Sequence, residues 1–221
     1  MNTRPTTTLF TWMFIKLYAN IKLFNSNPQI KGEMELPRGY PYLILGGLTL
    51  LVTLLAGALD PAFLSLSLAL ISVGIMMSRE YPSFPAAILA CLLVLTPYLS
   101  ARLPYLENSF VIATVFILFL VLEYVFPYSF LLVRYLLYVP LILWMLTAFL
   151  GILEDVTVTG NWGEFILHLL FLLLVFTDTM TLSDFWDWDA PRIKTFRLLA
   201  TTVMAIMIPV AAFYAAPLSI I

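Results

Sequence analysis

Four ionisable side chains lie inside stretches that are otherwise apolar, and their chemistry needs explaining first. They are Glu123, Arg134, His168 and Asp178. A charged side chain near the middle of a lipid bilayer costs at least about 2.5 kcal/mol, so such residues mark either paired helices or a path for protons or ions. We therefore take these four residues as a candidate functional site, an intramembrane polar network.

The spacing of three of these residues predicts that they converge near one face of the membrane. Glu123 and Arg134 are almost equally far from a turn at Tyr128, so the rise of a helix places each roughly 8 Å below that turn. Asp178 lies roughly 6 Å from the end of a later apolar run by the same rise. A structural clamp, in which Arg134 binds one or both carboxylates, is the interpretation we favour. The alternative is a half-pathway in which Asp178 or Glu123 exchanges protons with the cytoplasm.

His168 belongs to a polar stripe along one predicted helix. At about 100° per residue, Glu164, His168 and Asp178 fall within about 80° of one another, on a face that also carries Phe171 and Val175. The separation of ten positions between His168 and Asp178 spans about 15 Å, which is too far for direct proton transfer. We therefore expect His168 to be a hydrogen-bonded residue near the membrane interface.

The segment 183–197 is the most distinctive polar stretch of the chain. It places two tryptophans and three aspartates before three basic residues, in the sequence SDFWDWDAPRIKTFR. One interpretation is an interfacial loop whose acids neutralise its own bases. The other is a docking surface for a protein partner or for lipid, formed by Trp186, Trp188, Arg192 and Lys194. A metal site made by the aspartates is disfavoured, because no His, Cys or phosphate-binding glycine loop lies beside them.

The elements that must position these residues are membrane-spanning helices. Of the 221 residues, 62% are hydrophobic and 11% are charged, against about 45–50% and about 25% in soluble domains, which excludes a soluble fold. Continuous apolar runs of about 20 residues favour helices over a barrel. Seven such runs occur, at 41–59, 61–78, 84–100, 109–126, 129–153, 163–182 and 198–219. We expect an all-α polytopic transmembrane bundle of about seven spans, with residues 39–221 as a single domain.

Residues 1–38 are expected to form a cytoplasmic or interfacial arm. Within it, residues 7–24 are aromatic and aliphatic but interrupted by Lys16, Asn20 and Lys22, which predicts a helix lying in the interface, with an eighth span as the alternative. Nine Lys and Arg residues fall on the N-terminal side of the predicted topology, and only Arg102 falls opposite. This distribution predicts a cytoplasmic N-terminus and a C-terminus on the other face.

Prolines and small residues inside the runs are expected to shape helix packing. Pro97, Pro140 and Pro209 each remove a backbone donor inside a predicted span, which predicts kinked helices. Small side chains allow helices to approach closely. The candidates are Gly46, Gly47, Ser65, Ser67 and Ser72.

The rare residues limit the possible functions. One cysteine, Cys91, and one histidine exclude disulfide frameworks, CxxC redox pairs and multi-histidine metal sites, and we expect no cofactor. No GxSxG or HExxH motif occurs, and no basic patch suited to nucleic acid is present. We expect a non-catalytic accessory subunit that scaffolds a larger membrane complex, with lipid and other membrane subunits as partners. The alternative is a small transporter or ion-conducting protein that uses Glu123, Arg134 and Asp178.

Overall fold

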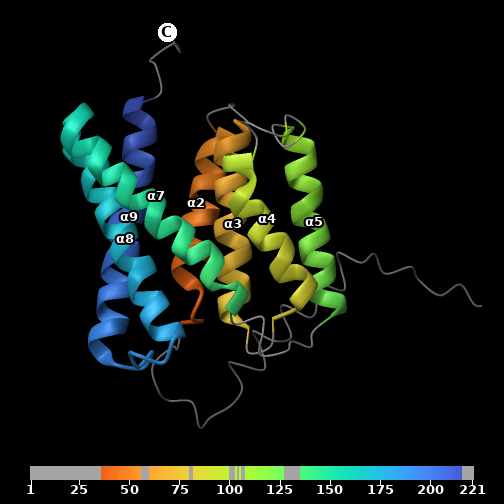
Figure 1. The fold of residues 1–221 in the computed structure, drawn as a ribbon. Coiled ribbons are helices and arrows are strands. Elements are labelled where there is room, and N and C mark those ends of the chain that lie inside the picture. Colours follow the sequence, from red (N-terminus) through yellow and green to blue (C-terminus); the bar gives the residue numbers. More distant parts are fainter. Residues whose placement is uncertain are drawn as a thin grey trace, which may run out of the picture. The chain divides into compact units, whose positions relative to one another are not determined.

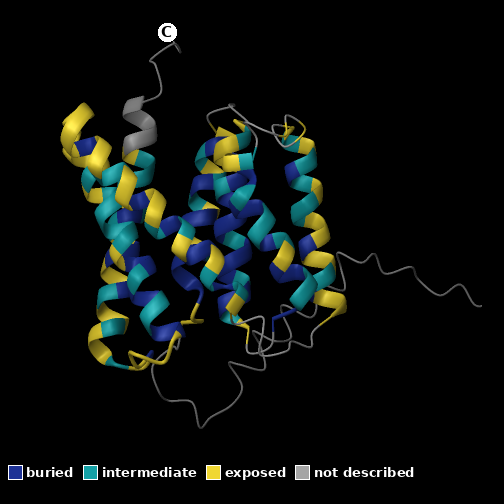
Figure 2. Cartoon of the chain, viewed as in Figure 1, coloured by how far each residue is buried: buried dark blue, intermediate teal, exposed yellow. Residues whose placement is uncertain are grey.

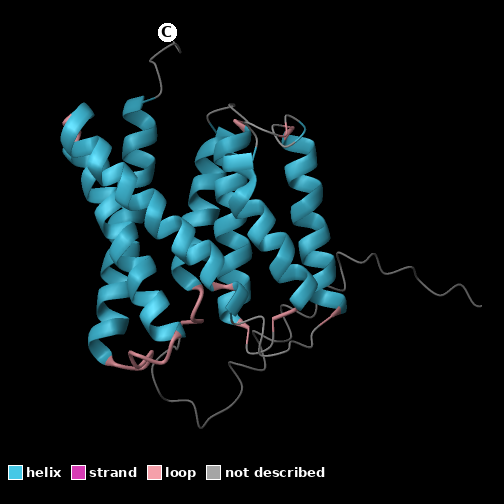
Figure 3. Cartoon of the chain, viewed as in Figure 1, coloured by secondary structure: helices cyan, strands magenta, loops and turns pink. Residues whose placement is uncertain are grey.

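The computed structural model describes residues 36–55, 60–79, 82–99, 103, 105, 108–126 and 135–215, and these residues form helices and turns without strands. Figures 1 and 3 show the arrangement. The α-helices in this part of the chain are α2 (Tyr40–Leu55), α3 (Pro61–Ser78), α4 (Phe84–Leu99), α5 (Ser109–Val125), α7 (Tyr138–Glu154), α8 (Trp162–Leu182) and α9 (Pro191–Ala215). The expectation of an all-helical fold is confirmed. The interfacial helix expected at 7–24 lies outside the described residues.

Four helical segments are long and apolar enough to cross a membrane. They are Pro61–Ser78, Tyr138–Thr159, Trp162–Leu182 and Pro191–Val210, whereas α2, α4 and α5 are apolar but shorter. A span of about 20 residues covers the hydrocarbon core of a bilayer. Insertion of the chain into a membrane is thus supported by length and composition, and the count of seven spans stays a prediction.

The bounds of the last helix differ most from expectation. α9 begins at Pro191, seven residues before the predicted start at 198, because proline is favoured in the first helical turn and the basic residues that follow can be helical. Pro140 lies in the first turn of α7, where a missing N–H removes no bond that the helix needs. The kink expected at Pro140 is therefore not required. Pro97 and Pro209 lie inside α4 and α9, as expected.

Among the described helices, α2 to α5 each pack against the next in the sequence, and so do α7 to α9. α2 also packs against α9, and α7 contacts α4. In Figure 1 the start of α2, the α3–α4 connection and the α8–α9 connection lie at the lower end of the bundle, which we call the α8–α9 end. The α7–α8 connection lies at the opposite end, which we call the α7–α8 end. Consecutive helices thus alternate in direction, as short connections require.

Glycine allows α2 and α3 to pack closely. A Cβ atom on Gly46 would lie 2.8 Å from the backbone oxygen of Ser67, and one on Gly74 would lie 2.8 Å from the side chain of Leu43. By contrast, a Cβ atom on Gly47 would meet nothing within 4 Å. Ser65 joins α3 to α4 by donating to the carbonyl oxygen of Leu93. Gly46 and Ser65 therefore make the close contacts expected of small residues.

The buried core is centred on α3, with α4 and α2 packed against it, and Figure 2 shows buried residues concentrated there. The outward faces of the other helices carry large exposed apolar side chains, for example Phe110 on α5, Leu150 on α7 and Leu199 on α9. Exposed apolar surface on this scale suits lipid as the surrounding solvent.

Candidate functional site

The most deeply buried ion pair joins α8 to α9. The Nε atom of Arg197 lies 2.8 Å from Oδ1 of Asp178, and both side chains are almost completely buried. Each buried charge would be costly alone, so the pair ties the two helices together near the α8–α9 end. Sequence analysis placed Arg197 among the loop residues and did not identify it as a partner.

Aromatic rings enclose the guanidinium group of Arg197. Its Cζ atom lies 4.5 Å from the ring centroid of Trp188 and 5.3 Å from that of Tyr40. The guanidinium group of Arg38 lies 5.3 Å from the same Trp188 ring, and Arg197 Nη2 donates a hydrogen bond to the backbone oxygen of Arg38. Cation–π contacts of this kind stabilise a buried cation. Trp188, expected at a partner or lipid surface, is only 9% exposed and covers Arg197.

An aromatic stack extends from this ion pair along α8. Tyr42 is fully buried, and its hydroxyl makes no well-directed hydrogen bond with the described residues. The Tyr42 ring stacks on Trp144 with centroids 5.7 Å apart, and Trp144 packs against Phe171 at 5.8 Å. Phe171 lies one turn after His168, so the stack occupies the apolar stretch between the two polar ends of α8.

A second ion pair ties the α3–α4 connection to α5. Oε1 of the buried Glu123 lies 3.4 Å from Nε of Arg79. The Glu123 Oε2 atom accepts a hydrogen bond from the backbone N–H of Ser83, just before α4, at 2.9 Å. Arg79 Nη1 also donates to the backbone oxygen of Glu123. Glu123 thus holds the end of α5 against the start of α4.

Arg134, the partner expected for Glu123, lies outside the described residues, so that pairing stays a prediction. Among the described residues, Glu123 pairs with Arg79 and Asp178 pairs with Arg197. A signal for the second pair was present in the sequence. Asp178 lies four residues before the end of α8 and Arg197 lies six residues after the start of α9, so the two are at similar depths, which is the argument that suggested Glu123 and Arg134.

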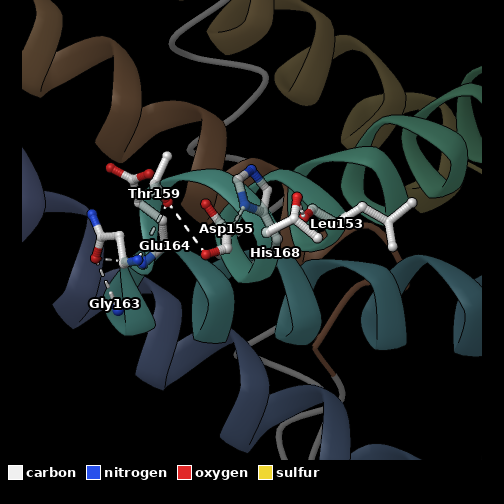
Figure 4. Close-up of polar contacts among 8 residues, drawn as sticks. Leu153, Asp155, Thr159, Gly163, Glu164 and His168 are labelled. Carbon is white, nitrogen blue, oxygen red and sulfur yellow. Dashed lines mark hydrogen bonds and ion pairs between the residues drawn. The ribbon is translucent and has the colours of Figure 1, made fainter.

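His168 forms a third polar pair, at the α7–α8 end. Its Nδ1 atom lies 2.7 Å from Oδ2 of Asp155, whose side chain is buried (Figure 4). Asp155 is the first residue of η2 (Asp155–Thr159), a π-helical turn that continues α7. A Cβ atom on Gly151 would lie 2.8 Å from three atoms of the imidazole ring. The glycine therefore provides the space in which the ring sits.

All three pairs connect separate elements of the fold, α8 with α9, the α3–α4 connection with α5, and η2 with α8. The chain matches no protein-family model, no curated protein and no solved structure. The role of the three pairs is therefore argued from their contacts. Each pair gives a buried carboxylate a cationic or hydrogen-bonding partner on another element, which is the arrangement of a clamp between helix ends.

The α8–α9 connection presents an aromatic surface outside these pairs. Phe185 is 79% exposed and Trp186 is 39% exposed, and Trp186 packs edge-on against Phe176. Arg192 is exposed, and Lys194 forms an exposed ion pair with Asp189 at 3.1 Å. Sequence analysis singled out Trp186 but not the more exposed Phe185. Within the described part of the chain, no group of three His, Cys, Asp or Glu residues is arranged to hold a metal ion.

Proposed function

We propose that this chain is a non-catalytic integral membrane subunit that acts as a structural scaffold in a larger membrane complex. The buried pair between Asp178 and Arg197 carries this proposal. In this pair the Asp178 side chain of α8 contacts another helix, and the rings of Trp188 and Tyr40 enclose the guanidinium group of Arg197. A scaffold needs a rigid frame of helices, and three such contacts at helix ends supply one.

We further propose seven spans with the N-terminus in the cytoplasm. Arg38, Arg79 and Arg192 belong to segments that lie at the α8–α9 end of the bundle. Positive residues in short loops stay on the cytoplasmic side. The α8–α9 end would then face the cytoplasm, and the α7–α8 end would face the other compartment.

The exposed aromatic side chains of the α8–α9 connection support a role in assembly. Backbone N–H groups of Phe185 and Trp186 both donate to the carbonyl oxygen of Met180, so the turn that carries these rings is ordered. Together with Arg192 and the ion pair of Lys194 with Asp189, they offer a partner large aromatic rings and charged groups. Aromatic and arginine residues dominate the energetics of protein interfaces.

Isolation of the tagged chain from its native membrane in a mild detergent tests the proposal. We expect at least one other membrane protein to co-isolate at a fixed stoichiometry, measured by native mass spectrometry. A chain that is isolated alone, as a monomer, would contradict the proposal.

A second candidate is proton or ion transport, and one observation favours it. Neither carboxylate oxygen of Asp178 makes a well-directed hydrogen bond with the described residues, although the charge is paired. A carboxylate held in this way can accept a proton. In liposomes, Asp178→Asn and Glu123→Gln should abolish a pH-dependent flux if the chain transports. Unchanged flux in these variants, or no flux through the wild-type chain, would exclude this candidate.

A further inference from the structure

Two buried polar atoms lie unpaired beside the ion pair of Glu123 and Arg79. Ser83, which directly precedes α4, is completely buried, and its Oγ atom makes no hydrogen bond with the described residues. Oε1 of Glu123 makes no hydrogen bond with those residues either, although it lies 3.4 Å from Nε of Arg79. An unpaired polar atom inside a protein is costly, and nearly all such atoms in native structures have a protein or water partner.

Both atoms belong to the contact that joins α5 to the start of α4. The backbone N–H of Ser83 donates to Oε2 of Glu123 at 2.9 Å, so the hydroxyl of this serine and the second oxygen of this carboxylate are neighbours. Arg79 Nη1 donates to the backbone oxygen of Glu123, which keeps the guanidinium group beside the same residue. Figure 1 shows the α3–α4 connection and the end of α5 at the same end of the bundle. Polar groups from the end of α3, from the connection and from α5 therefore converge there.

The usual role of a serine before a helix does not occupy the Ser83 hydroxyl. A serine at this position normally accepts a hydrogen bond from the backbone N–H two or three residues later. The residue two positions later is Pro85, which has no N–H, and Oγ accepts no hydrogen bond from Ala86. The carbonyl oxygen of Ser83 does accept from Ala87 at 2.9 Å, so α4 begins regularly. The hydroxyl is therefore available to another partner.

The charges of this cluster define the chemistry of that partner. A bound anion would meet the Glu123 carboxylate, and a bound cation would meet the guanidinium group of Arg79. A small neutral molecule that donates to Oε1 and accepts from the Ser83 hydroxyl meets neither repulsion. Buried water molecules typically make about three hydrogen bonds to polar groups of this kind. The side chain of Arg79 is 44% exposed, so solvent lies next to the cluster.

We propose that an ordered water molecule bridges Ser83 Oγ and Glu123 Oε1. The water donates to the carboxylate oxygen and accepts from the hydroxyl, and it completes the contact between α5 and the start of α4. The proposal goes beyond the proposed function and does not depend on it, because it concerns a contact within the chain.

The direct test is a cryo-EM structure of the full wild-type chain in nanodiscs with a bound antibody fragment, at a resolution that shows ordered water. Density for a water molecule should lie about 2.6–3.2 Å from both Ser83 Oγ and Glu123 Oε1. The density should be missing from the map of Ser83→Ala. A wild-type map that resolves other buried waters but none here would overturn the proposal. So would a direct hydrogen bond from the Ser83 hydroxyl to Glu123, or one to it from the N–H of Ala86.

A second test uses the sign of the stability change in Ser83→Ala. Removal of an unpaired buried hydroxyl should leave the midpoint of thermal unfolding unchanged or raise it, whereas removal of a bridged hydroxyl should lower the midpoint by about 2–4 °C. Ser72→Ala is the matched control. Ser72 is also completely buried, but its hydroxyl donates to the carbonyl oxygen of Leu68 in its own helix, so its midpoint should fall less. An unchanged or raised midpoint in Ser83→Ala would contradict the bridging water.

Discussion

Asp178 on α8 and Arg197 on α9 are 2.8 Å apart and almost completely buried, although they are 19 positions apart in the sequence. Their contact closes the hairpin of the last two helices at the α8–α9 end. Tyr40 on α2 and Trp188 before α9 enclose the same guanidinium group. One arginine therefore connects three helices, and it is the residue whose replacement tests the fold most sharply.

Arg197→Leu should destabilise the protein by about 3–5 kcal/mol, because it leaves the buried Asp178 carboxylate without its cation. The double variant Asp178→Leu with Arg197→Leu loses the same aromatic contacts but leaves no stranded charge, so it should be more stable than the single variant. Unfolding free energies measured in detergent provide the comparison. Equal losses in the two variants would show that the pair does not interact directly.

Trp188→Ala should destabilise the protein by about 3–5 kcal/mol, because a buried ring is removed from the core and from Arg197. Trp186→Ala is the matched control, since this ring is 39% exposed against 9% for Trp188. Its midpoint of thermal unfolding in detergent should decrease less. If the two replacements have the same effect, Trp188 does not cover the ion pair.

Gly46→Ala should destabilise the protein by about 1–3 kcal/mol, because the new methyl group would force α2 and α3 apart. Gly47→Ala, at the next position, places its methyl group where nothing lies within 4 Å, so it should not destabilise the protein and should stabilise it by up to about 1 kcal/mol, because alanine is the better helix former. Both variants are measured by unfolding in detergent. The opposite order would contradict the packing of α2 on α3.

Gly151→Ala should displace the imidazole of His168 and break its contact with Asp155, since the new Cβ would lie 2.8 Å from three ring atoms. In a His168→Ala background the same change should cost little. A double-mutant cycle on thermal unfolding should therefore give a coupling of about 0.5–3 kcal/mol between the two positions. A coupling of zero would mean that the ring does not occupy this position.

The helices themselves could be predicted from the sequence because each apolar run is continuous and bounded by polar residues. α3 has the predicted bounds, 61–78. The start of α9 was missed because Arg192, Lys194 and Arg197 read as loop residues. Arg197 is tolerated inside the bundle only because Asp178 and Trp188 surround it, and these contacts depend on the folded hairpin.

The polar pairs were predicted less well than the helices, for a physical reason. An ionisable residue inside an apolar run is expected to need a partner, but that partner can lie far away in the sequence. Arg79 reaches Glu123 across 44 positions, and no local spacing predicts that contact. Asp155 was not identified from the sequence, because a π-helical extension of α7 leaves no hydrophobic period there.

We propose that the buried pair between Asp178 and Arg197 is structural and that the chain acts as one subunit of a larger membrane complex. The most direct test of this proposal is isolation of the Asp178→Leu with Arg197→Leu variant from the native membrane, followed by native mass spectrometry beside the wild type. Both chains should carry the same partner at the same stoichiometry. A wild-type chain that carries no partner, or a folded variant that has lost the partner of the wild type, would contradict it.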